Sequence, residues 1–329
     1  MRGPYRIRPL DSSNNLRLRI GSPSLLLKDA MVQSNSVLRP LTYTPIARFL
    51  FGIILVMSGG LSTATAQTLT GDQLGNGLSI SVWSPHAQCP GVAPLVAVEI
   101  DPDRYRFTVH YYRQEGVSEP LDIRQWQERT GHDLVFNAGL FRENYAYLGL
   151  LYGNGRSLGS KRHATWQGLF AAEPAADRSP RARVLDLTFD TFDEERVPYR
   201  EVAQSLMLLD RTGKVRVRQT GKRAYQTLVA EQSNGHLLLL KTTEVVSLYT
   251  LGECLRDAFP SLQQVMAMDG GSSSDIAVSP SLRQATSKMA GTHGWIPLLE
   301  DSLATHIGLP AVIGVSPRPE QTGVKAISK

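Results

Sequence analysis

Two apolar runs in the second half of the chain constrain the fold most strongly. Residues 236–242 read HLLLLKT and residues 264–269 read QVMAMD. An unbroken apolar run of this length is typical of a strand covered on both faces. Between them, Thr250-x-x-Glu253 has the spacing of a capping box and predicts a helix that begins at Thr250 and stops before Pro260. The sequence therefore predicts a strand, a helix and a second strand that ends at an aspartate.

Other segments alternate between apolar and polar residues, which is the pattern of a strand with one buried face. Residues 104–112 (RYRFTVHYY), 183–190 (RVLDLTFD) and 214–219 (KVRVRQ) all have it. A helix is predicted from Asp122 to Gly131, and residues 171–183 are the best loop candidate. With 42% hydrophobic residues, the chain is expected to form one α+β domain: a mixed, mainly antiparallel β-sheet with a few flanking helices.

The N-terminal segment has the features of an export signal. Arg48 precedes the apolar run 49–61, and Ala64 and Ala66 form an A-x-A site that predicts cleavage before Gln67. The run is short for a membrane span, which needs roughly 20 residues. We therefore expect a periplasmic or secreted protein with no stable membrane anchor after cleavage, and a retained N-terminal anchor is the alternative.

The predicted organisation follows from this signal. Residues 1–66 are expected to be an extension and signal peptide whose true start is possibly Met31, and residues 67–94 an N-terminal segment. Residues 95–317 are expected to form the domain, followed by a disordered tail, 318–329. Residues 1–66 hold eight of the 35 basic and two of the 30 acidic residues, which leaves 27 basic and 28 acidic residues in the mature chain. That part lacks the basic excess typical of nucleic-acid binding, so we expect no nucleic-acid partner.

Cys89 and Cys254 are the two cysteines of the chain, and both follow the predicted signal. An exported protein meets an oxidising environment in which a disulfide can form. Two buried thiols are the alternative. Neither cysteine has the C-x-x-C spacing of a metal or redox site.

Asp269 directly follows the second apolar run and precedes Gly270, Gly271 and three serines. Glycine allows a backbone turn with positive φ and leaves amide N–H groups uncovered for an anion. The carboxylate and these amides would then share one pocket, whereas a plain tight turn is the simpler alternative. A second apolar strand ends similarly, at Asn137-Ala-Gly139, which Phe141 follows.

These motifs, in this order and spacing, resemble the phosphodiester glycosidase family. The resemblance rests on FNAGLF, LGLLYGNGRSLG, QSLMLLDRTGKV, LVAEQSNGHLLLLKTTEVVSLYTLGECLRD and AMDGGSSSDIAV, and it covers about residues 95–315. It implies hydrolysis of the glycosidic bond in a sugar-1-phosphodiester, with a sugar phosphate or glycopolymer as substrate. It also implies these catalytic and substrate-binding positions: Asn137, Gly139, Phe141, Gln204, Ser205, Asp269, Gly270, Gly271, Ser272 and Ser273.

One departure from the family pattern concerns charge. The family's arginine aligns without gaps to Gln226, so the cation expected beside a phosphate is missing from its usual place. Arg223, three residues upstream, is the predicted substitute, and a changed substrate or reduced activity is the alternative. Glu143 is a second carboxylate candidate.

The chemistry implied by the resemblance suits these residue types. A departing phosphate ester is already an anion, so the site mainly needs donors for it. Asp269 would activate water or steady oxocarbenium charge, and Asn137 would hold a sugar hydroxyl or a phosphate oxygen. No cofactor is required. A divalent cation is possible at the acidic residues in DLTFDTFDEER (186–196), although a solvated strand edge explains them equally.

Two other functions remain open. The serious competitor is a non-catalytic exported protein that binds carbohydrate or glycopolymer in the same pocket, which the Gln226 departure favours. A serine hydrolase using Ser273 is the lesser alternative, because Asp275 stands where G-x-S-x-G requires glycine. His293 and His306 are read as loop or core histidines, since their spacing of 13 fits no helical metal site.

Overall fold

A computed structural model describes residues 69, 71–176, 179–287, 294–301 and 306–319. The predicted signal peptide, the proposed start at Met31, the cleavage site and His293 lie outside the described residues. Within the described residues, no helix is long and apolar enough to cross a membrane.

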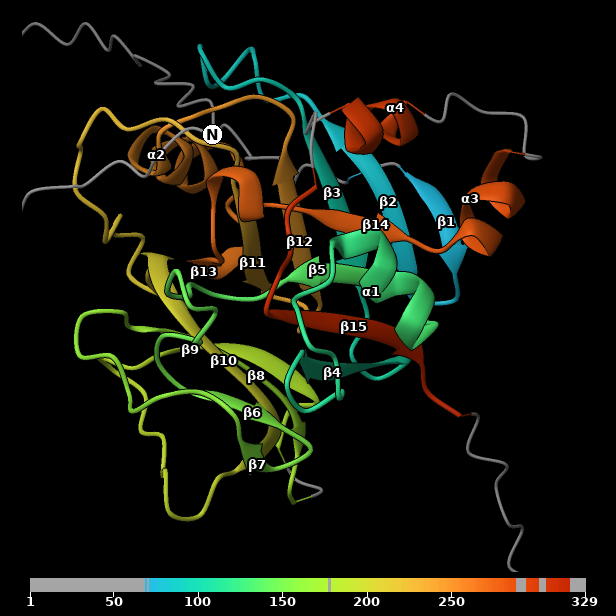
Figure 1. Ribbon diagram of the computed structural model, residues 1–329. Helices are drawn as coiled ribbons and strands as arrows, with labels where there is room; N and C mark the ends of the chain where they lie inside the picture. Colours follow the sequence, from blue (N-terminus) through green and yellow to red (C-terminus); the bar gives the residue numbers. More distant parts are fainter. Residues whose placement is uncertain (1–68, 70, 177–178, 288–293, 302–305, 320–329) are drawn as a thin grey trace, which may run out of the picture. The chain divides into compact units, whose positions relative to one another are not determined.

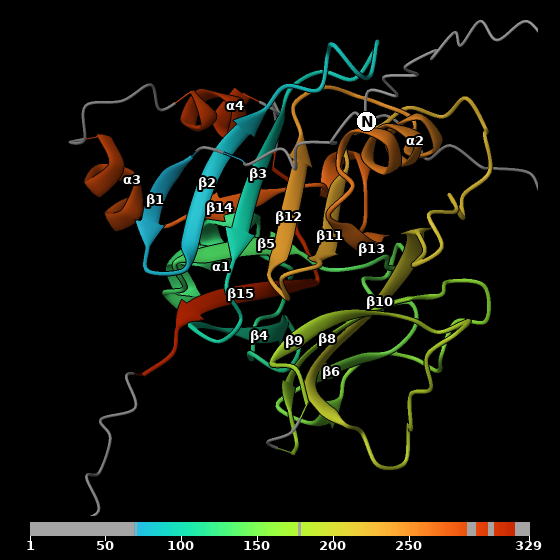
Figure 2. The same cartoon turned by 180° about the vertical axis from the view of Figure 1, so that it is seen from behind.

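Two antiparallel β-sheets form the described domain (Figures 1 and 2). The larger sheet joins eleven of the described strands, in the order β1-β2-β3-β12-β11-β13-β10-β6-β7, with β8 paired to both β10 and β9. Its strands are β1 (Asp72–Gly75), β2 (Leu78–Trp83), β3 (Leu95–Ile100), β6 (Leu151–Gly153), β7 (Arg156–Ser157), β8 (Gly168–Pro174), β9 (Ala182–Asp186), β10 (Tyr199–Leu209), β11 (Thr227–Gln232), β12 (Leu237–Thr242) and β13 (Leu262–Ala267).

The smaller sheet has the order β14-β5-β15-β4. Its strands are β4 (Tyr105–Tyr111), β5 (Leu134–Asn137), β14 (Ile276–Val278) and β15 (Ala311–Pro317). In β4 every second residue from Tyr105 is buried, as its alternation predicts. The mainly antiparallel α+β class is confirmed.

The described helices flank these sheets. They are α1 (Ile123–Thr130), α2 (Leu248–Ala258), α3 (Pro280–Ser287) and α4 (Trp295–Asp301). Helix α1 contacts β5, β14 and β15 of the smaller sheet, whereas α2 contacts β10, α3 contacts β1, and α4 contacts β2 and β3. Asp122 caps α1 through a complete capping box, and Gly131 ends it in the left-handed conformation, as predicted.

The predicted start of α2 is wrong by one turn. The helix begins at Leu248, because the Ser247 hydroxyl accepts a hydrogen bond from the Thr250 amide and caps the end. Thr250 and Glu253 therefore lie inside the helix. The predicted end holds, since α2 closes at Phe259, directly before Pro260.

Two other segment predictions also fail. The described residues 214–219 contain only a single bridge, Leu209 to Val215, because the Asp210 carboxylate accepts hydrogen bonds from the Thr212 and Lys214 amides and folds the chain into a tight turn. The predicted loop 171–183 is shorter than expected, since β8 continues to Pro174 and β9 begins at Ala182.

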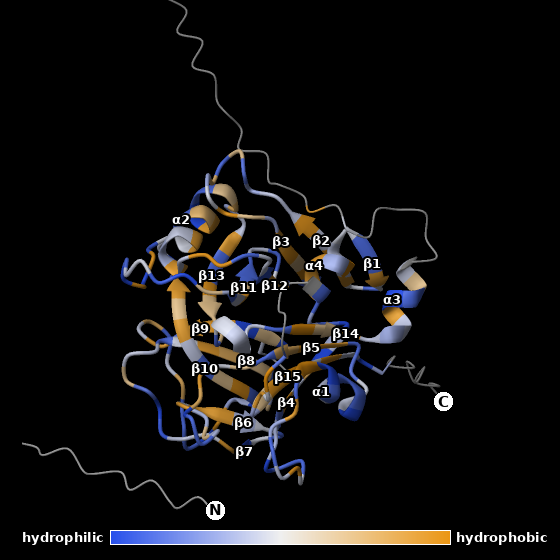
Figure 3. Cartoon of the chain, turned by 45° about the horizontal axis from the view of Figure 1, so that its top comes forward, coloured by the Kyte–Doolittle hydropathy of each residue, from blue (hydrophilic) through white to orange (hydrophobic). Residues whose placement is uncertain are grey.

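Apolar side chains pack on both faces of the larger sheet, and Figure 3 shows hydrophobic residues along its strands. One cluster lies between the sheets and includes Val98 and Leu239 from the larger sheet and Phe136 and Ile313 from the smaller one. Another lies under α2 and includes Leu255. The continuous burial of β12 on both faces confirms the interpretation of its apolar run.

Residues at both ends of the predicted domain join this architecture. Strands β1 and β2, which belong to the predicted segment 67–94, extend the larger sheet beside β3. Arg318, the first residue of the predicted tail, pairs through two nitrogens with the Glu173 carboxylate at 2.7 and 2.8 Å. Cys89 and Cys254 form a disulfide, which answers the question that the sequence left open.

Candidate functional site

The candidate site lies where the chain crosses from the larger sheet to the smaller one. Strand β13 ends at Ala267, β14 begins at Ile276, and the turn between them carries Asp269 and the serines. Strand β14 pairs with β5, so Ile276 lies opposite Phe136. The crossing therefore brings Asp269 to the end of β5, at Asn137, as the two strand endings suggested.

Asn137 binds the two sides of this crossing together. Its Nδ2 donates to the backbone oxygens of Asp269 (2.8 Å) and Ala138 (3.1 Å). Its Oδ1 accepts from the Asp275 amide at 3.1 Å. The carboxamide is almost completely buried, and both of its N–H donors are used by backbone. Asn137 therefore fixes the geometry of the turn, and its predicted contact with substrate has no free donor to use.

Burial raises the pKa of the Asp269 carboxyl to about 6, although hydrogen bonds from the Ser273 side chain and the Gly270 amide lower it. The carboxylate is partly exposed and has two donors within its own turn. A carboxyl group with this pKa changes its protonation state close to neutral pH, which is the property of a general base or acid.

The prediction that both glycine amides stay uncovered is wrong. The Gly270 amide donates to the Asp269 carboxylate at 3.0 Å, and the Gly271 amide donates to the Tyr225 carbonyl at 2.9 Å. Only Gly271 has positive φ, at 70°, while Gly270 is extended. A β-carbon at Gly270 would lie 2.9 Å from the Gln226 side-chain oxygen and 3.0 Å from the Tyr225 carbonyl oxygen, so both neighbours would have to shift.

Gly139 is required for close approach. Its amide donates to the Tyr147 hydroxyl, and a β-carbon would lie 2.5 Å from the Gln204 carbonyl oxygen. The Tyr147 hydroxyl in turn donates to that same carbonyl at 2.8 Å. The segment after β5 is thus packed directly against β10, which explains why glycine follows Asn137 by two residues.

Gln204 and Ser205, predicted to bind substrate, are fully buried and hold the scaffold instead. Gln204 Oε1 accepts from the amides of Leu150 and His163, and its Nε2 donates to the carbonyls of His163 and Trp166. Ser205 Oγ donates to the Ala267 carbonyl at 2.6 Å. The carboxamide is saturated by backbone, so Gln204 anchors the segment that contains His163 and Trp166.

The remaining predicted positions lie around the turn or outside it. Gln226 is buried against Gly270, with its side-chain Nε2 donating to the Ala224 carbonyl. Arg223 is exposed and donates to the Val245 carbonyl at 2.9 Å. Glu143 is exposed in a turn between Arg142 and Ala146, and no described contact joins it to Asp269. Phe141 is partly buried and Ser272 is exposed.

Comparison with known proteins decides the family. Residues 130–309 match the phosphodiester glycosidase family, a range that covers more than half of the chain and contains the whole crossing between the sheets. The chain belongs to the phosphodiester glycosidase family.

Two solved structures share the fold with this family member. One is a hypothetical protein from Synechocystis, with 12% identity and a TM-score of 0.52 over 78% of this chain and 65% of that protein, so the chain spans about two thirds of its length. The other is the catalytic domain of zebrafish N-acetylglucosamine-1-phosphodiester alpha-N-acetylglucosaminidase, auto-inhibited by its pro-peptide, with 14% identity and a TM-score of 0.50 over 77% and 88% of the two chains. No curated protein sequence matches significantly.

The structure also gathers ionisable residues that the family motifs did not indicate. Asp275 Oδ2 lies 2.5 Å from His306 Nδ1, and Asp275 Oδ1 accepts from the Ile276 amide. Burial raises the pKa of the Asp275 carboxyl, while its hydrogen bond and charge interaction with His306 and the charge of Lys241 lower it. The sequence interpretation of His306 as a loop or core histidine missed this pair. Asp275 gave one signal, since it is a carboxylate directly before a buried strand, whereas Asp269 follows one.

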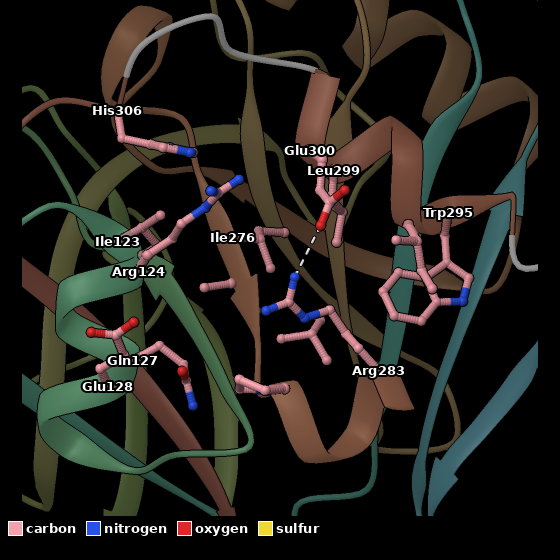
Figure 4. Close-up of a pocket in the computed structure, with 14 residues that line it drawn as sticks. Ile123, Arg124, Gln127, Glu128, Ile276, Arg283, Trp295, Leu299, Glu300 and His306 are labelled. Atoms are coloured by element: carbon pink, nitrogen blue, oxygen red, sulfur yellow. Dashed lines mark hydrogen bonds and ion pairs between the residues drawn. The ribbon is translucent and has the colours of Figure 1, made fainter. Parts of the chain in front are cut away.

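A pocket adjoins this pair (Figure 4). Strand β14 and helices α1, α3 and α4 line it, and His306 and Arg124 stand at the same end of it in the view. Its lining contains apolar side chains such as Ile123 and Leu299. It also contains an ion pair between Arg283 and Glu300 at 3.0 Å. The pocket and the Asp269 turn are thus separated by β14 and its preceding residue, Asp275.

The acidic segment 186–196 does not gather as a cation site. Asp186 and Asp210 both contact Arg216, at 3.2 and 3.3 Å, and Asp190 pairs with Arg211. Among the described residues, no group of three or more His, Cys, Asp or Glu side chains could hold a metal ion. Arginines balance the charge of these carboxylates, and Asp186 is fully buried and not on a solvated strand edge.

Proposed function

We propose that the protein is an exported hydrolase that cleaves the glycosidic bond of a sugar-1-phosphodiester in an envelope or exopolysaccharide glycoconjugate. Family membership supports the reaction class, and the Asp269 carboxyl, with its pKa raised to about 6, is the observation that carries the proposal. The zebrafish enzyme with the same fold is named for a substrate of this chemical type.

Asp269 acts as the general base in the proposed reaction. Above pH 6 it is mostly ionised and accepts a proton from water, whose oxygen forms the new bond to the anomeric carbon. The bond between that carbon and the bridging oxygen breaks, and the phosphate ester leaves with the electron pair. Because this leaving group is a stable anion, the reaction needs no strong general acid. Hydrogen bonds from Ser273 and Gly270 orient the carboxylate.

Export is part of the same proposal. The disulfide between Cys89 and Cys254 is typical of an oxidising compartment outside the cytoplasm. The predicted A-x-A cleavage site before Gln67 gives a consistent route.

The test is turnover of a sugar-1-phosphodiester, either aryl-linked or UDP-linked, by the purified protein. Wild type should release the phosphate ester, and Asp269→Asn should lower the rate by about 10² to 10⁴, the range for loss of a general base. Asp103→Asn removes a carboxylate from an exposed turn and should leave the rate unchanged. Equal rates for wild type and Asp269→Asn would exclude Asp269 as the base.

A non-catalytic carbohydrate-binding protein is the second candidate. Its support is the neutral Gln226 at the position of the family's arginine, together with the commitment of Arg223 to the Val245 carbonyl. Saturable sugar binding without turnover on any substrate of the panel would favour it. The serine-hydrolase alternative loses support, because the Ser273 side chain donates to Asp269 and lies in a 3₁₀ turn, not at a strand-to-helix elbow.

A further inference from the structure

Lys241 is a fully buried lysine in β12, with none of its surface exposed. Lysine almost never occurs fully buried unless its charge is paired. Its position opposite Thr227 in the sheet turns it toward the space between the two sheets, because Thr227 Oγ1 bonds to Ser274 Oγ of the Asp269 turn at 2.9 Å. Lys241 therefore lies under the candidate site.

The surroundings of the ammonium all belong to that site. Its Nζ lies 4.9 Å from the centre of the Tyr225 ring. The Tyr225 carbonyl accepts the Gly271 amide, and the next residue, Gln226, is the one that stands where the family has arginine. Among the described residues, Asp275 supplies the facing negative charge. Lys241 thus provides the site with a cation from the strand beside Gln226, the position at which the family has arginine.

The ammonium has more donors than described acceptors. It carries three N–H donors, and among the described residues it donates a hydrogen bond to the Thr242 carbonyl at 3.1 Å. Among the described residues, the hydrogen bonds on the Asp275 carboxylate come from the Ile276 amide and His306, and none comes from the Lys241 ammonium. A buried ammonium with unused N–H donors can form hydrogen bonds to an oxyanion.

We propose that Lys241 binds the phosphate of the substrate and replaces the cation that Gln226 lacks, an inference that rests on the proposed function. The partly buried Tyr225 ring lies over the ammonium, so the ring must move aside when the anion enters. Asp275, paired with His306, balances the lysine charge in the empty site. The bound anion then belongs to a cluster in which two basic side chains, Lys241 and His306, face the carboxylate of Asp275.

The ammonium also titrates within an accessible range. Burial lowers the pKa of Lys241 to about 8, and the Asp275 charge partly opposes this change. Lys241 is therefore mostly charged at pH 7 and mostly neutral at pH 9.5. Tyr225, Asp275 and His306 are the other titratable groups of this cluster, and burial raises the pKa of Asp275 while His306 and Lys241 lower it.

Sulfate is a suitable probe, because it is a tetrahedral dianion whose charge is constant from pH 6 to 10. Its dissociation constant can be measured by titration calorimetry for wild type, Lys241→Met and Lys241→Arg. Lys222→Met removes an exposed lysine and is the charge-matched control. Lys241→Met should weaken sulfate at least tenfold at pH 7, and Lys222→Met should change it less than twofold. Circular dichroism and melting temperature verify that each variant is folded.

The pH series distinguishes a lysine that binds the anion from a lysine that has only a structural role. Wild-type affinity should fall about tenfold between pH 7 and pH 9 as Lys241 loses its proton, whereas Lys241→Arg should keep its affinity throughout. Equal affinity in Lys241→Met and wild type, or no sulfate binding by wild type, would overturn the inference. Hydrolysis that persists without a Lys241-dependent anion site would refute this inference alone, and anion binding without hydrolysis would refute only the proposed function.

Discussion

Asp269 and Asp275 show how neighbouring carboxylates of one turn take different roles. Both are shielded from water, which raises the pKa of each. Asp269 receives only neutral donors, from Ser273 and Gly270, whereas Asp275 faces His306 and the charge of Lys241. The first carboxylate therefore has spare acceptor capacity for water or substrate, and the second belongs to a buried charge cluster.

A pH profile tests the role of Asp269. Because the base must be ionised, kcat/KM should rise through pH 6 and level off by about pH 7, and Asp269→Asn should lose this ascending limb with its activity. A profile that stays flat between pH 5 and 7 would argue against ionisation of Asp269 as the controlling step.

Thermal melting shows whether the same variant is folded. The folded pKa of Asp269 is raised above its unfolded value of 3.8, so its stabilising contribution is complete below pH 3.8 and is lost as pH rises through about 6. Asp269→Asn should consequently be at least as stable as wild type at pH 8. The difference between the two proteins should shrink below pH 4.

At the scale of elements, Gln204 of β10 joins the sheet to the segment around His163 and Trp166. Gln204→Ala would leave backbone groups of Leu150, His163 and Trp166 without their partner, at a cost of about 1 to 3 kcal/mol in unfolding free energy. Urea denaturation measures this loss. Gln88→Ala, at an exposed position, is the matched control and should be neutral. If Gln204→Ala left the unfolding free energy unchanged, the segment around His163 and Trp166 would not depend on Gln204 for its stability.

The sequence predicted those elements whose signals are local. The helix start at Asp122 and the apolar run of β12 needed no distant partner, so α1 and β12 were correct. Residues 214–219 failed because alternation does not reveal that Asp210 bends the chain into a turn. The meeting of Asn137 and Asp269 was predictable, since both follow buried strands.

The sequence could not show which polar side-chain atoms of the site are free and which already form hydrogen bonds. The Asn137 carboxamide bonds to residues 132 and 138 positions away, and Gln204 is saturated by a segment about 40 positions away. Lys241 was hidden because it ends an apolar run and is not among the site positions that the family resemblance implies. Only the pairing of β11 with β12 brings it beside the turn.

For the whole molecule, the disulfide links the segment before β3 to α2 across 165 residues. Replacing both cysteines by serine should lower the free energy of unfolding by about 2 to 4 kcal/mol, the usual value for a native disulfide. Chemical denaturation of the variant and of wild type, each with and without reductant, measures the effect. An unchanged midpoint for the variant, or an equal response of both proteins to reductant, would show that packing under α2 stabilises the fold without the disulfide.

The proposed reaction breaks the bond between the anomeric carbon and the bridging oxygen. Hydrolysis of a UDP-linked sugar in water enriched with oxygen-18, followed by mass spectrometry of the products, locates the broken bond. The account predicts that the label enters the anomeric hydroxyl of the free sugar and that the released UDP contains none. Label in a phosphate product would mean cleavage at phosphorus and would contradict the assignment as a glycosidase.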